Sequence, residues 1–353
     1  MKKLIILLLF YLSIVETLLA QVYSAKHYGF KEGLPNSFVT QIFQDTQGNI
    51  WFTTSGGFTK FNGSSFKNFG LDNGLQTELV RCITADLTGK LFVGTTGNGV
   101  YKLVKDTLIS ICSNSLPKEI YAIKGDKYGH VWVATDKGLY QITSDENCIN
   151  YTKKLNLPEG PVTHISEDKQ GNIWFGYDEY IGLFKLELPS ANIVQQYDST
   201  NGFTSGRILS SFHDSKNNTW ITTFEGLYVI KNNQKNATKI NHKDIPNFYL
   251  YEIVEPKEGL LLIGSHEEGI IFYDTKTNQV IKKIGSKNGL KAEIAFRLFQ
   301  DVENNIWVSS WGMGVSRLNL TGWSKIDENT ATTSKLIYNV IPLNNGVMYS
   351  ASD

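Results

Sequence analysis

One short motif, Asp-x-x-Gly-Asn-Ile-Trp, recurs along the chain at a nearly constant interval and limits the folds that the chain can adopt. Its clearest copies begin at Asp45, Asp126 and Asp168. The position where the motif ends recurs eight times at separations of 40 to 46 residues, at 51, 92, 132, 174, 220, 262, 307 and 348. Five of these eight positions are Trp, although the whole chain has only seven Trp. A period of this length, with several strands in each unit, is typical of a β-propeller.

Each unit has the residue pattern of four short antiparallel strands. An apolar run rich in β-branched residues, such as 162–165, predicts the first strand. The Asp and Gly predict a tight turn, and the Ile-Trp-Phe or Val-Trp-Val that follows predicts a strand buried on both faces. A polar turn that closes on Gly leads to a third strand, as at 100–103, and a more polar fourth strand follows, as at 65–69. Four antiparallel strands per unit, repeated radially, form a propeller blade.

Loops that end in Gly followed by Leu or Phe join several of these units, for example at 31–34 and 287–290. The first of these loops follows a strand-like segment, 26–30, that precedes any complete unit. We therefore predict an all-β fold, a seven-bladed β-propeller of four-stranded antiparallel blades. In this fold residues 26–30 pair with the unit that contains Trp307 and close the ring, which removes exposed sheet edges. The alternative is an eight-bladed ring that uses residues 336–350.

The first twenty residues differ in character from the repeats. Lys2 and Lys3 precede an almost entirely apolar run, and Ala20 offers a small residue at a cleavage site. This pattern predicts a signal peptide over residues 1–20 and an exported, periplasmic protein. An uncleaved membrane anchor is the alternative. We expect the propeller to occupy residues 21–322 and residues 323–353 to be the start of a further, truncated repeat.

The charge balance and the cysteines exclude several classes of function. The 34 Lys and Arg equal the 34 Asp and Glu, which argues against a nucleic acid or an anionic membrane bound by bulk electrostatics. The three Cys show neither a Cys-x-x-Cys pair nor the His spacing of a zinc site. We expect Cys82 to be a buried, small apolar residue. Cys112 and Cys148 could form a disulfide in an exported protein, and the sequence leaves this pairing open.

The units resemble the two-component regulator propeller repeat, with the pattern D-x-x-G-N-[IV]-W-[FV]-[GAT]-T-x-x-G-[GLV] and x-x-G-L loops between copies. Residues 45–57 and 126–139 match the pattern closely, and residues 168–183 match it with a longer loop. The resemblance covers the chain from about residue 23 onward. In that family such propellers are the periplasmic sensing regions of histidine kinases and hybrid two-component systems, and their ligands are typically glycans or other nutrients. The resemblance implies a non-enzymatic ligand sensor whose membrane helix and kinase lie outside this chain.

A second resemblance is to propellers of the streptogramin-lyase type, which share the Gly-Asn-Ile-Trp-Phe-Thr strand. Those proteins are enzymes with a His/Glu pair and a divalent metal at one face. The best local candidate in this chain is the run from His266 to Glu268, and no second catalytic His aligns with confidence. A third possibility is a propeller that serves only as a structural interaction module. No Ser/His/Asp arrangement, P-loop or dinucleotide-binding Gly loop can be assembled from the sequence.

The expected recognition surface is the face that carries the turns between the second and third strands. The last four of these turns combine aromatic rings with carboxylates, whereas the first three are small or polar. Aromatic rings can stack on the C–H faces of a sugar, and carboxylates can accept hydrogen bonds from its hydroxyls. The predicted ligand-binding residues are Tyr177, Asp178, Glu179, Tyr180, Phe224, Glu225, His266, Glu267, Glu268 and Trp311.

The remaining expectations concern partners and inner-strand residues. The expected partners are a small-molecule or oligosaccharide ligand, and either downstream sensor-kinase modules or a second copy of the chain. The near-neutral charge favours an uncharged ligand over a phosphorylated one, and we expect no catalytic residue, metal or cofactor. The repeated Trp should lie in the core and the repeated Asp should form turns. His164, Arg81 and Arg297 fall on inner strands, where they could line a channel or form structural contacts.

Overall fold

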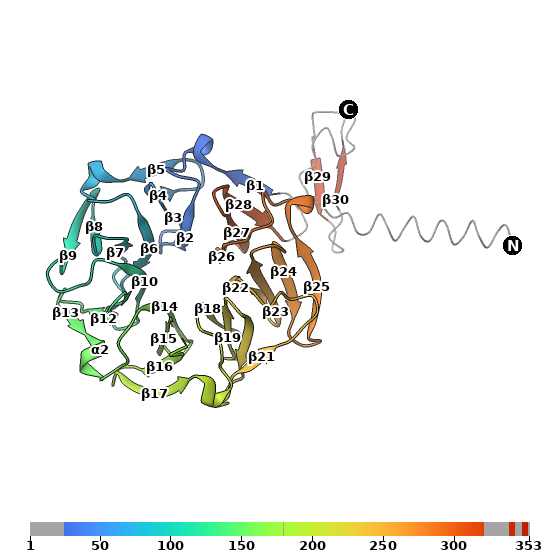
Figure 1. Cartoon of the computed structure of the whole chain (residues 1–353). Helices are drawn as coiled ribbons and strands as arrows, with labels where there is room; N and C mark the ends of the chain where they lie inside the picture. The colour runs from blue at the N-terminus through green and yellow to red at the C-terminus, as the bar shows by residue number, and fades with distance from the viewer. Residues whose placement is uncertain (1–24, 179, 321–338, 343–347, 352–353) are drawn as a thin grey trace, which may run out of the picture. The chain divides into compact units, whose positions relative to one another are not determined.

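Seven four-stranded antiparallel sheets stand side by side in a ring, so that the chain forms a seven-bladed β-propeller (Figure 1). This computed structural model describes residues 25–178, 180–320, 339–342 and 348–351. The propeller unit runs from Ala25 to Leu318, and the C-terminal strands belong to a second unit. The prediction of an all-β, seven-bladed fold is therefore confirmed.

Within each blade the strands are ordered from the centre of the ring outward (Figure 1). The innermost strands are β2 (Val39–Gln44), β6 (Val80–Ala85), β10 (Ile120–Gly125), β14 (Val162–Glu167), β18 (Ile208–His213), β22 (Leu250–Lys257) and β26 (Arg297–Gln300). The second strands are β3 (Ile50–Thr54), β7 (Leu91–Thr95), β11 (Val131–Thr135), β15 (Ile173–Tyr177), β19 (Thr219–Thr223), β23 (Leu260–Ser265) and β27 (Asn305–Ser310). The third strands are β4 (Gly57–Phe61), β8 (Val100–Val104), β12 (Gly138–Ile142), β16 (Leu183–Glu187), β20 (Gly226–Ile230), β24 (Ile270–Asp274) and β28 (Gly314–Asn319). The outermost strands are β5 (Phe66–Phe69), β9 (Thr107–Ile111), β13 (Cys148–Asn150), β17 (Asn192–Tyr197), β21 (Thr238–Ile240), β25 (Gln279–Ile284) and β1 (Ala25–Tyr28).

Short helical turns lie in the connectors that follow several outer strands. They are η1 (Phe30–Glu32), η2 (Leu71–Asn73), α2 (Tyr151–Lys154), η3 (Ser199–Asn201) and η4 (Ser286–Asn288). After η1, Gly33 has a φ of 115°, a left-handed conformation that favours glycine. The next residue, Leu34, is then buried in the core. The Gly-Leu connectors therefore turn the chain and insert an apolar side chain as it enters the next blade.

The Asp of each complete motif holds both the turn and the Trp that follows. One carboxylate oxygen of Asp45 accepts hydrogen bonds from the backbone N–H groups of Gln47 at 3.0 Å and Asn49 at 2.9 Å. The other oxygen accepts a hydrogen bond from the indole N–H of Trp51 at 2.8 Å. The same bond, at 2.8–3.0 Å, joins Trp132 to Asp126, Trp174 to Asp168, Trp220 to Asp214 and Trp307 to Asp301. The turn-forming role of the Asp is thus confirmed, and the same carboxylate satisfies a buried indole donor.

The repeated Trp residues fill the interfaces between neighbouring blades. Trp132 of the third blade is fully buried and lies in one apolar cluster with Phe175 of the fourth blade. Trp51 of the first blade lies in another cluster with Val93 and Tyr101 of the second blade. The predicted core position of the Trp residues is confirmed, and they are not available to a ligand.

The seventh blade combines three strands from the end of the propeller with one from its beginning. Strand β1 pairs antiparallel with β28, with Ala25 opposite Leu318 and Tyr28 opposite Val315. The buried ring of Tyr28 stacks on Trp307, with 5.6 Å between the ring centres. The predicted closure is confirmed, although the strand ends at Tyr28 because Phe30 already belongs to η1. The eight-bladed alternative is wrong, since the ring closes with seven blades.

A disulfide joins Cys112, which follows β9, to Cys148 at the start of β13, and the two Cα atoms are 6.2 Å apart. It therefore links the outer edges of the second and third blades. The sequence had left this pairing open. Cys82 is a free cysteine in β6 and is buried among apolar residues, as expected.

The C-terminal unit contains two described strands, β29 (Asn339–Pro342) and β30 (Met348–Ala351), which pair antiparallel. Strand β30 overlaps the strand that the motif at position 348 predicts. The assignment of residues 323–353 to a truncated repeat stays a prediction. The proposed signal peptide at residues 1–20 lies outside the described residues. Across the part of the chain that the structure describes, no helix is long and apolar enough to cross a membrane.

Candidate functional site

A cavity of about 630 Å³ lies where the inner strands converge, and all seven blades contribute residues to its wall. The wall includes Ser55, Thr96, Phe224, His266 and Trp311, which belong to turns between second and third strands. The cavity is therefore on the face where the turn pattern places the recognition surface. Its wall mixes aromatic rings, hydroxyl groups and guanidinium groups.

A β-bulge in the inner strands decides which side chains face the cavity. In β2 the pairing register shifts between Val39 and Gln41, so that Thr40 is left out of the ladder. A bulged residue is turned away from the regular alternation of a strand. The corresponding shifts occur in β6, β10, β14 and β18, and the residues skipped there also line the cavity: Arg81, Tyr121, Thr163 and Leu209.

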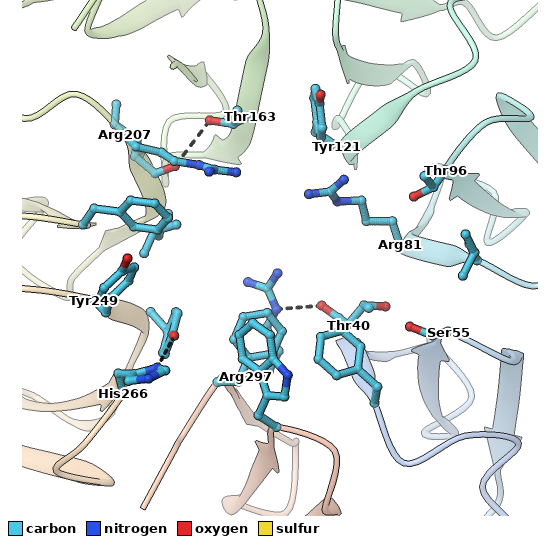
Figure 2. A pocket seen from close by; sticks show the side chains of 18 of the residues that line it. Thr40, Ser55, Arg81, Thr96, Tyr121, Thr163, Arg207, Tyr249, His266 and Arg297 are labelled. Carbon is cyan, nitrogen blue, oxygen red and sulfur yellow. Dashed lines mark hydrogen bonds between the residues drawn. The ribbon is translucent and has the colours of Figure 1, made fainter. Parts of the chain in front are cut away.

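Three arginines dominate the polar part of the wall. Figure 2 shows the side chains of Arg81, Arg207 and Arg297 pointing into the same space from three sides. Each guanidinium also lies over an aromatic ring, at 4.6 Å from Tyr121, 4.8 Å from Phe224 and 4.5 Å from Phe296 respectively. Cation–π contacts of this kind orient a guanidinium without neutralising its charge.

Carboxylates approach two of these arginines from outside the cavity wall. Asp178 lies 3.7 Å from Arg207, and Glu252 lies 3.7 Å from Arg297. Burial raises the pKa of Glu252, and the positive charge of Arg297 opposes that rise. The described residues that line the cavity include no Asp, Glu or Lys. The lining itself is therefore cationic, although the net charge of the whole chain is zero.

Three of the ten predicted ligand-binding residues line the cavity: Phe224, His266 and Trp311. Trp311 is 48% exposed, and its ring centre lies 5.1 Å from that of Phe38 and 5.2 Å from that of Phe296. The Nδ1 atom of His266 is 2.8 Å from the hydroxyl oxygen of Tyr251. The indole thus forms part of an aromatic rim with one exposed side.

Other predicted residues lie around this cavity without lining it. The hydroxyl of Tyr180 donates a hydrogen bond to Glu225 at 3.0 Å, and Asp178 faces Arg207. Glu268 forms an ion pair with Lys283 at 3.0 Å, and Glu267 is exposed in the same turn. Glu179 lies outside the described residues.

The expected placement of Tyr177 requires a correction. Tyr177 is the last residue of β15 and its side chain is fully buried. Its hydroxyl donates a hydrogen bond to the carbonyl oxygen of Pro158 at 2.8 Å. The turn begins one residue later than the sequence suggests, so the Tyr177 ring packs inside the blade and does not form a platform for a ligand.

A histidine–serine cluster lies farther along the inner strands, beside a separate cavity. The backbone N–H of Ser211 donates a hydrogen bond to Nε2 of His164 at 2.9 Å, which requires that nitrogen to be unprotonated. Burial, with contributions from Arg297 and His213, lowers the pKa of His164 to about 3. Ser166 lies 2.7 Å from the Ser211 hydroxyl and 3.1 Å from Nε2 of His213. His164 is therefore a neutral structural residue at neutral pH, as its inner-strand position suggests.

Acidification should destabilise the propeller through His164. An unfolded chain binds a proton at His164 near its ordinary pKa of about 6.5, whereas the folded chain resists it down to about 3. The stabilisation that neutral His164 contributes to the fold is fully present above pH 6.5, and it is lost as the pH falls below 6.5. Between pH 7 and pH 5 this group should lower the free energy of unfolding by about 2 kcal/mol. Urea unfolding of wild type and His164→Gln at both pH values tests this, and an equal pH dependence in both would contradict it.

The described residues offer no group of three His, Cys, Asp or Glu side chains that could hold a metal ion. The arginines are the main feature that the sequence-based site prediction missed. The turn pattern does not point to Arg207, and it leaves Arg81 and Arg297 as channel or structural residues, although the chain has only four Arg. The scarcity of Arg, and its occurrence at the start of inner strands, was the available signal.

The comparison with known families confirms the resemblance of the repeats. The model described as "Two component regulator propeller" matches residues 33–56 and 156–179. Two segments of the chain, one in the first blade and one in the fourth, are thus similar to this repeat. These repeats include Asp45 of the first blade and the Asp168–Trp174 motif of the fourth.

Similar proteins extend this comparison beyond the repeat. A histidine kinase of Formosa agariphila is 28% identical over 84% of this chain, which spans only 27% of that protein. The extracellular domain of a hybrid two-component system from B. thetaiotaomicron has 22% identity and a TM-score of 0.71, over 94% of this chain and 47% of that structure. Virginiamycin B lyase from Staphylococcus aureus has 16% identity and a TM-score of 0.68, over 84% of this chain and 99% of that structure. At these identities the two structures show only that they share the fold of this chain.

Proposed function

We propose that this chain is the extracytoplasmic ligand-sensing propeller of a two-component system, the N-terminal sensor part of a histidine kinase, and that it binds a glycan or other nutrient. The observation that carries the proposal is the central cavity on the turn face, where aromatic rings and hydrogen-bonding groups converge from all seven blades. Concave sites of this composition are the usual binding sites for small molecules. The cavity volume of about 630 Å³ is large enough for a small oligosaccharide.

Three further observations support an extracytoplasmic location. The disulfide between Cys112 and Cys148 suits an oxidising compartment, since cytosolic proteins rarely keep structural disulfides. The first twenty residues have the composition of a signal peptide. The similar structure from B. thetaiotaomicron is itself an extracellular domain. We propose that the signal passes to kinase modules or to a second copy of the chain, because this chain spans only 27% of the similar histidine kinase.

The alternative of a lyase-type enzyme has weaker support. It would need a metal and a catalytic His near the turn that contains His266. The Nδ1 atom of His266 faces the Tyr251 hydroxyl, and Glu268 is paired with Lys283. The described residues bring no second His to the wall of this cavity. We therefore propose binding without turnover and without a required metal.

Replacement of Trp311 by Ala should weaken ligand binding by about 1–3 kcal/mol, because the half-exposed indole would lose its stacking contact with the ligand. Thermal-shift screening with glycans and small nutrients can find the ligand, and calorimetry can then compare the variants. A substitution at Tyr177 would not test this site, because its side chain is buried.

Met313→Ala is the matched control for Trp311→Ala. Met313 is 53% exposed in the same turn but does not line the cavity, so its loss should leave the affinity unchanged. Equal affinity of wild type and Trp311→Ala would show that the ligand does not bind at the aromatic rim. Metal-dependent consumption of the bound ligand would instead favour the lyase-type alternative.

A further inference from the structure

We infer that the ligand of the central cavity is anionic, and that Arg81, Arg207 and Arg297 hold its carboxylate, sulfate or phosphate groups. This inference rests on the proposed function, because it names the chemical class of ligand for the same cavity. It departs from the uncharged ligand that the net charge of the chain suggests. The reason is that a ligand responds to the local charge of the wall, and net charge describes the whole molecule.

The first support is the distribution of arginine in the chain. Of its 34 Lys and Arg residues only four are Arg, and three of those four line this one cavity, where the described residues include no Lys. Lys is therefore the general cationic residue of this protein, and Arg is used at the centre of the ring. Arg presents a planar fork of N–H donors that matches the oxygen atoms of carboxylate, sulfate and phosphate, and Lys does not.

The second support is the way the guanidinium groups are held. Arg81 stacks over Tyr121 and Arg207 over Phe224, both of which also line the cavity. A ring face fixes the plane of a guanidinium and leaves its N–H donors at the edge free for another partner. This arrangement orients the three groups toward a common space before any ligand is present (Figure 2). Such preorganisation lowers the entropy cost of binding.

The third support is that the positive charge is incompletely compensated. Arg81 has no ion pair among the described residues, and the buried Nε atom of Arg207 has no hydrogen-bond partner among them. Asp178 and Glu252 each form an ion pair at 3.7 Å with one arginine, so two carboxylates face three guanidinium groups. Burial, with smaller contributions from Arg297 and Arg207, lowers the pKa of Arg81. A bound anion would satisfy the free donors and relieve the repulsion among three like charges.

A side-chain hydrogen bond between blades accounts for only one of the three arginines. The Nε atom of Arg297 donates a hydrogen bond to the carbonyl oxygen of Thr40 at 2.6 Å, which joins the seventh blade to the first. Arg81 and Arg207 make no corresponding side-chain hydrogen bond among the described residues, although Arg207 forms an ion pair with Asp178 of the fourth blade. They are therefore the residues on which the inference is best tested.

Isothermal titration of the whole chain with sulfate, citrate, trigalacturonate and neutral galactotriose tests the inference. We expect at least one of the three anions to bind with a stoichiometry of one, more weakly as the salt concentration rises. Arg81→Gln and Arg207→Gln should each weaken that binding about tenfold or more, because each removes a charge-assisted hydrogen bond. Preference for trigalacturonate would identify an acidic saccharide, and preference for sulfate or citrate would identify a compact anion.

Arg317→Gln is the matched control, because it removes the same charge from the fourth Arg, which stacks on Trp307 outside the cavity wall. It should bind the anion as wild type does, and thermal melting should show all variants folded. Failure of all three anions to bind, or equal binding by Arg81→Gln and Arg207→Gln, would overturn the inference. Binding of galactotriose that depends on Trp311 and not on the arginines would also overturn it, yet would leave the proposed sensing function standing. Anion binding accompanied by chemical conversion of the anion would instead contradict the sensing function alone.

Discussion

Deletion of Ala25–Tyr28 should destabilise the propeller more than loss of any single core side chain. These four residues form β1, the outer strand of the seventh blade, and their pairing with β28 closes the ring. The deletion removes a strand ladder together with the buried Tyr28 ring, whose loss alone should cost about 3–5 kcal/mol. It also leaves β28 as an open sheet edge that can pair with another chain. We expect a lower unfolding midpoint in denaturant and dimers or aggregates in size-exclusion chromatography.

Two substitutions at Tyr28 separate the packing of its side chain from the pairing of β1 with β28. Tyr28→Ala should lower the free energy of unfolding by about 3–5 kcal/mol, because the stacking on Trp307 and the packing on Phe61 are lost. Tyr28→Phe should be close to neutral, because the buried Tyr28 hydroxyl has no hydrogen-bond partner among the described residues. An unfolding midpoint that does not change on deletion of the strand would show that β1 does not close the ring.

Trp132→Ala should lower the free energy of unfolding by about 3–5 kcal/mol, because it empties a fully buried site between the third and fourth blades. It also removes the indole donor, at 2.8 Å, from one carboxylate oxygen of the buried Asp126. That oxygen would then be desolvated without a partner, which adds to the loss. Chemical unfolding followed by tryptophan fluorescence and by circular dichroism gives the free energy and checks that the transition stays cooperative.

Trp132→Phe is the matched comparison, because the second blade naturally carries Phe92 at the corresponding position. There Asp86 accepts hydrogen bonds from the backbone N–H groups of Thr88 and Lys90 without an indole donor. The Phe variant keeps most of the apolar volume and loses the indole bond, so its cost should be about 1–3 kcal/mol. Equal losses for the Ala and Phe variants would mean that the hydrogen bond outweighs the packing of the ring.

The architecture could be predicted from the sequence because its causes are local and repeated. The turn at Asp45 is formed by hydrogen bonds within a few residues, and the same turn recurs at Asp126 and Asp168. A short strand of bulky apolar residues that follows a tight turn has few ways to bury its side chains other than against neighbouring strands and sheets. A period of about forty residues then indicates blades. The incomplete first unit also predicted the closing strand, since a ring cannot leave one strand without a partner.

Other features follow from the same repeats but depend on where each side chain points. The indole–carboxylate bond joins residues only six positions apart, yet it needs the turn and the following strand in their final geometry. Tyr177 was misplaced by a single residue, which moved its ring from the face into the core of the blade. The pairing of Cys112 with Cys148 depends on the outer edges of two blades lying side by side.

The charge of the central cavity could not be predicted in this way. Arg81, Arg207 and Arg297 are far apart in the chain, and they meet because seven inner strands converge on one axis (Figure 2). The β-bulge that turns Arg81 toward the cavity lies in β6, where Cys82, Ile83 and Thr84 are buried in succession, so the alternation of the strand does not predict the direction of Arg81. Periodicity therefore specifies the ring, since each blade repeats the same local interactions. The charge at its centre arises from residues that differ between blades, and their direction depends on the closed ring.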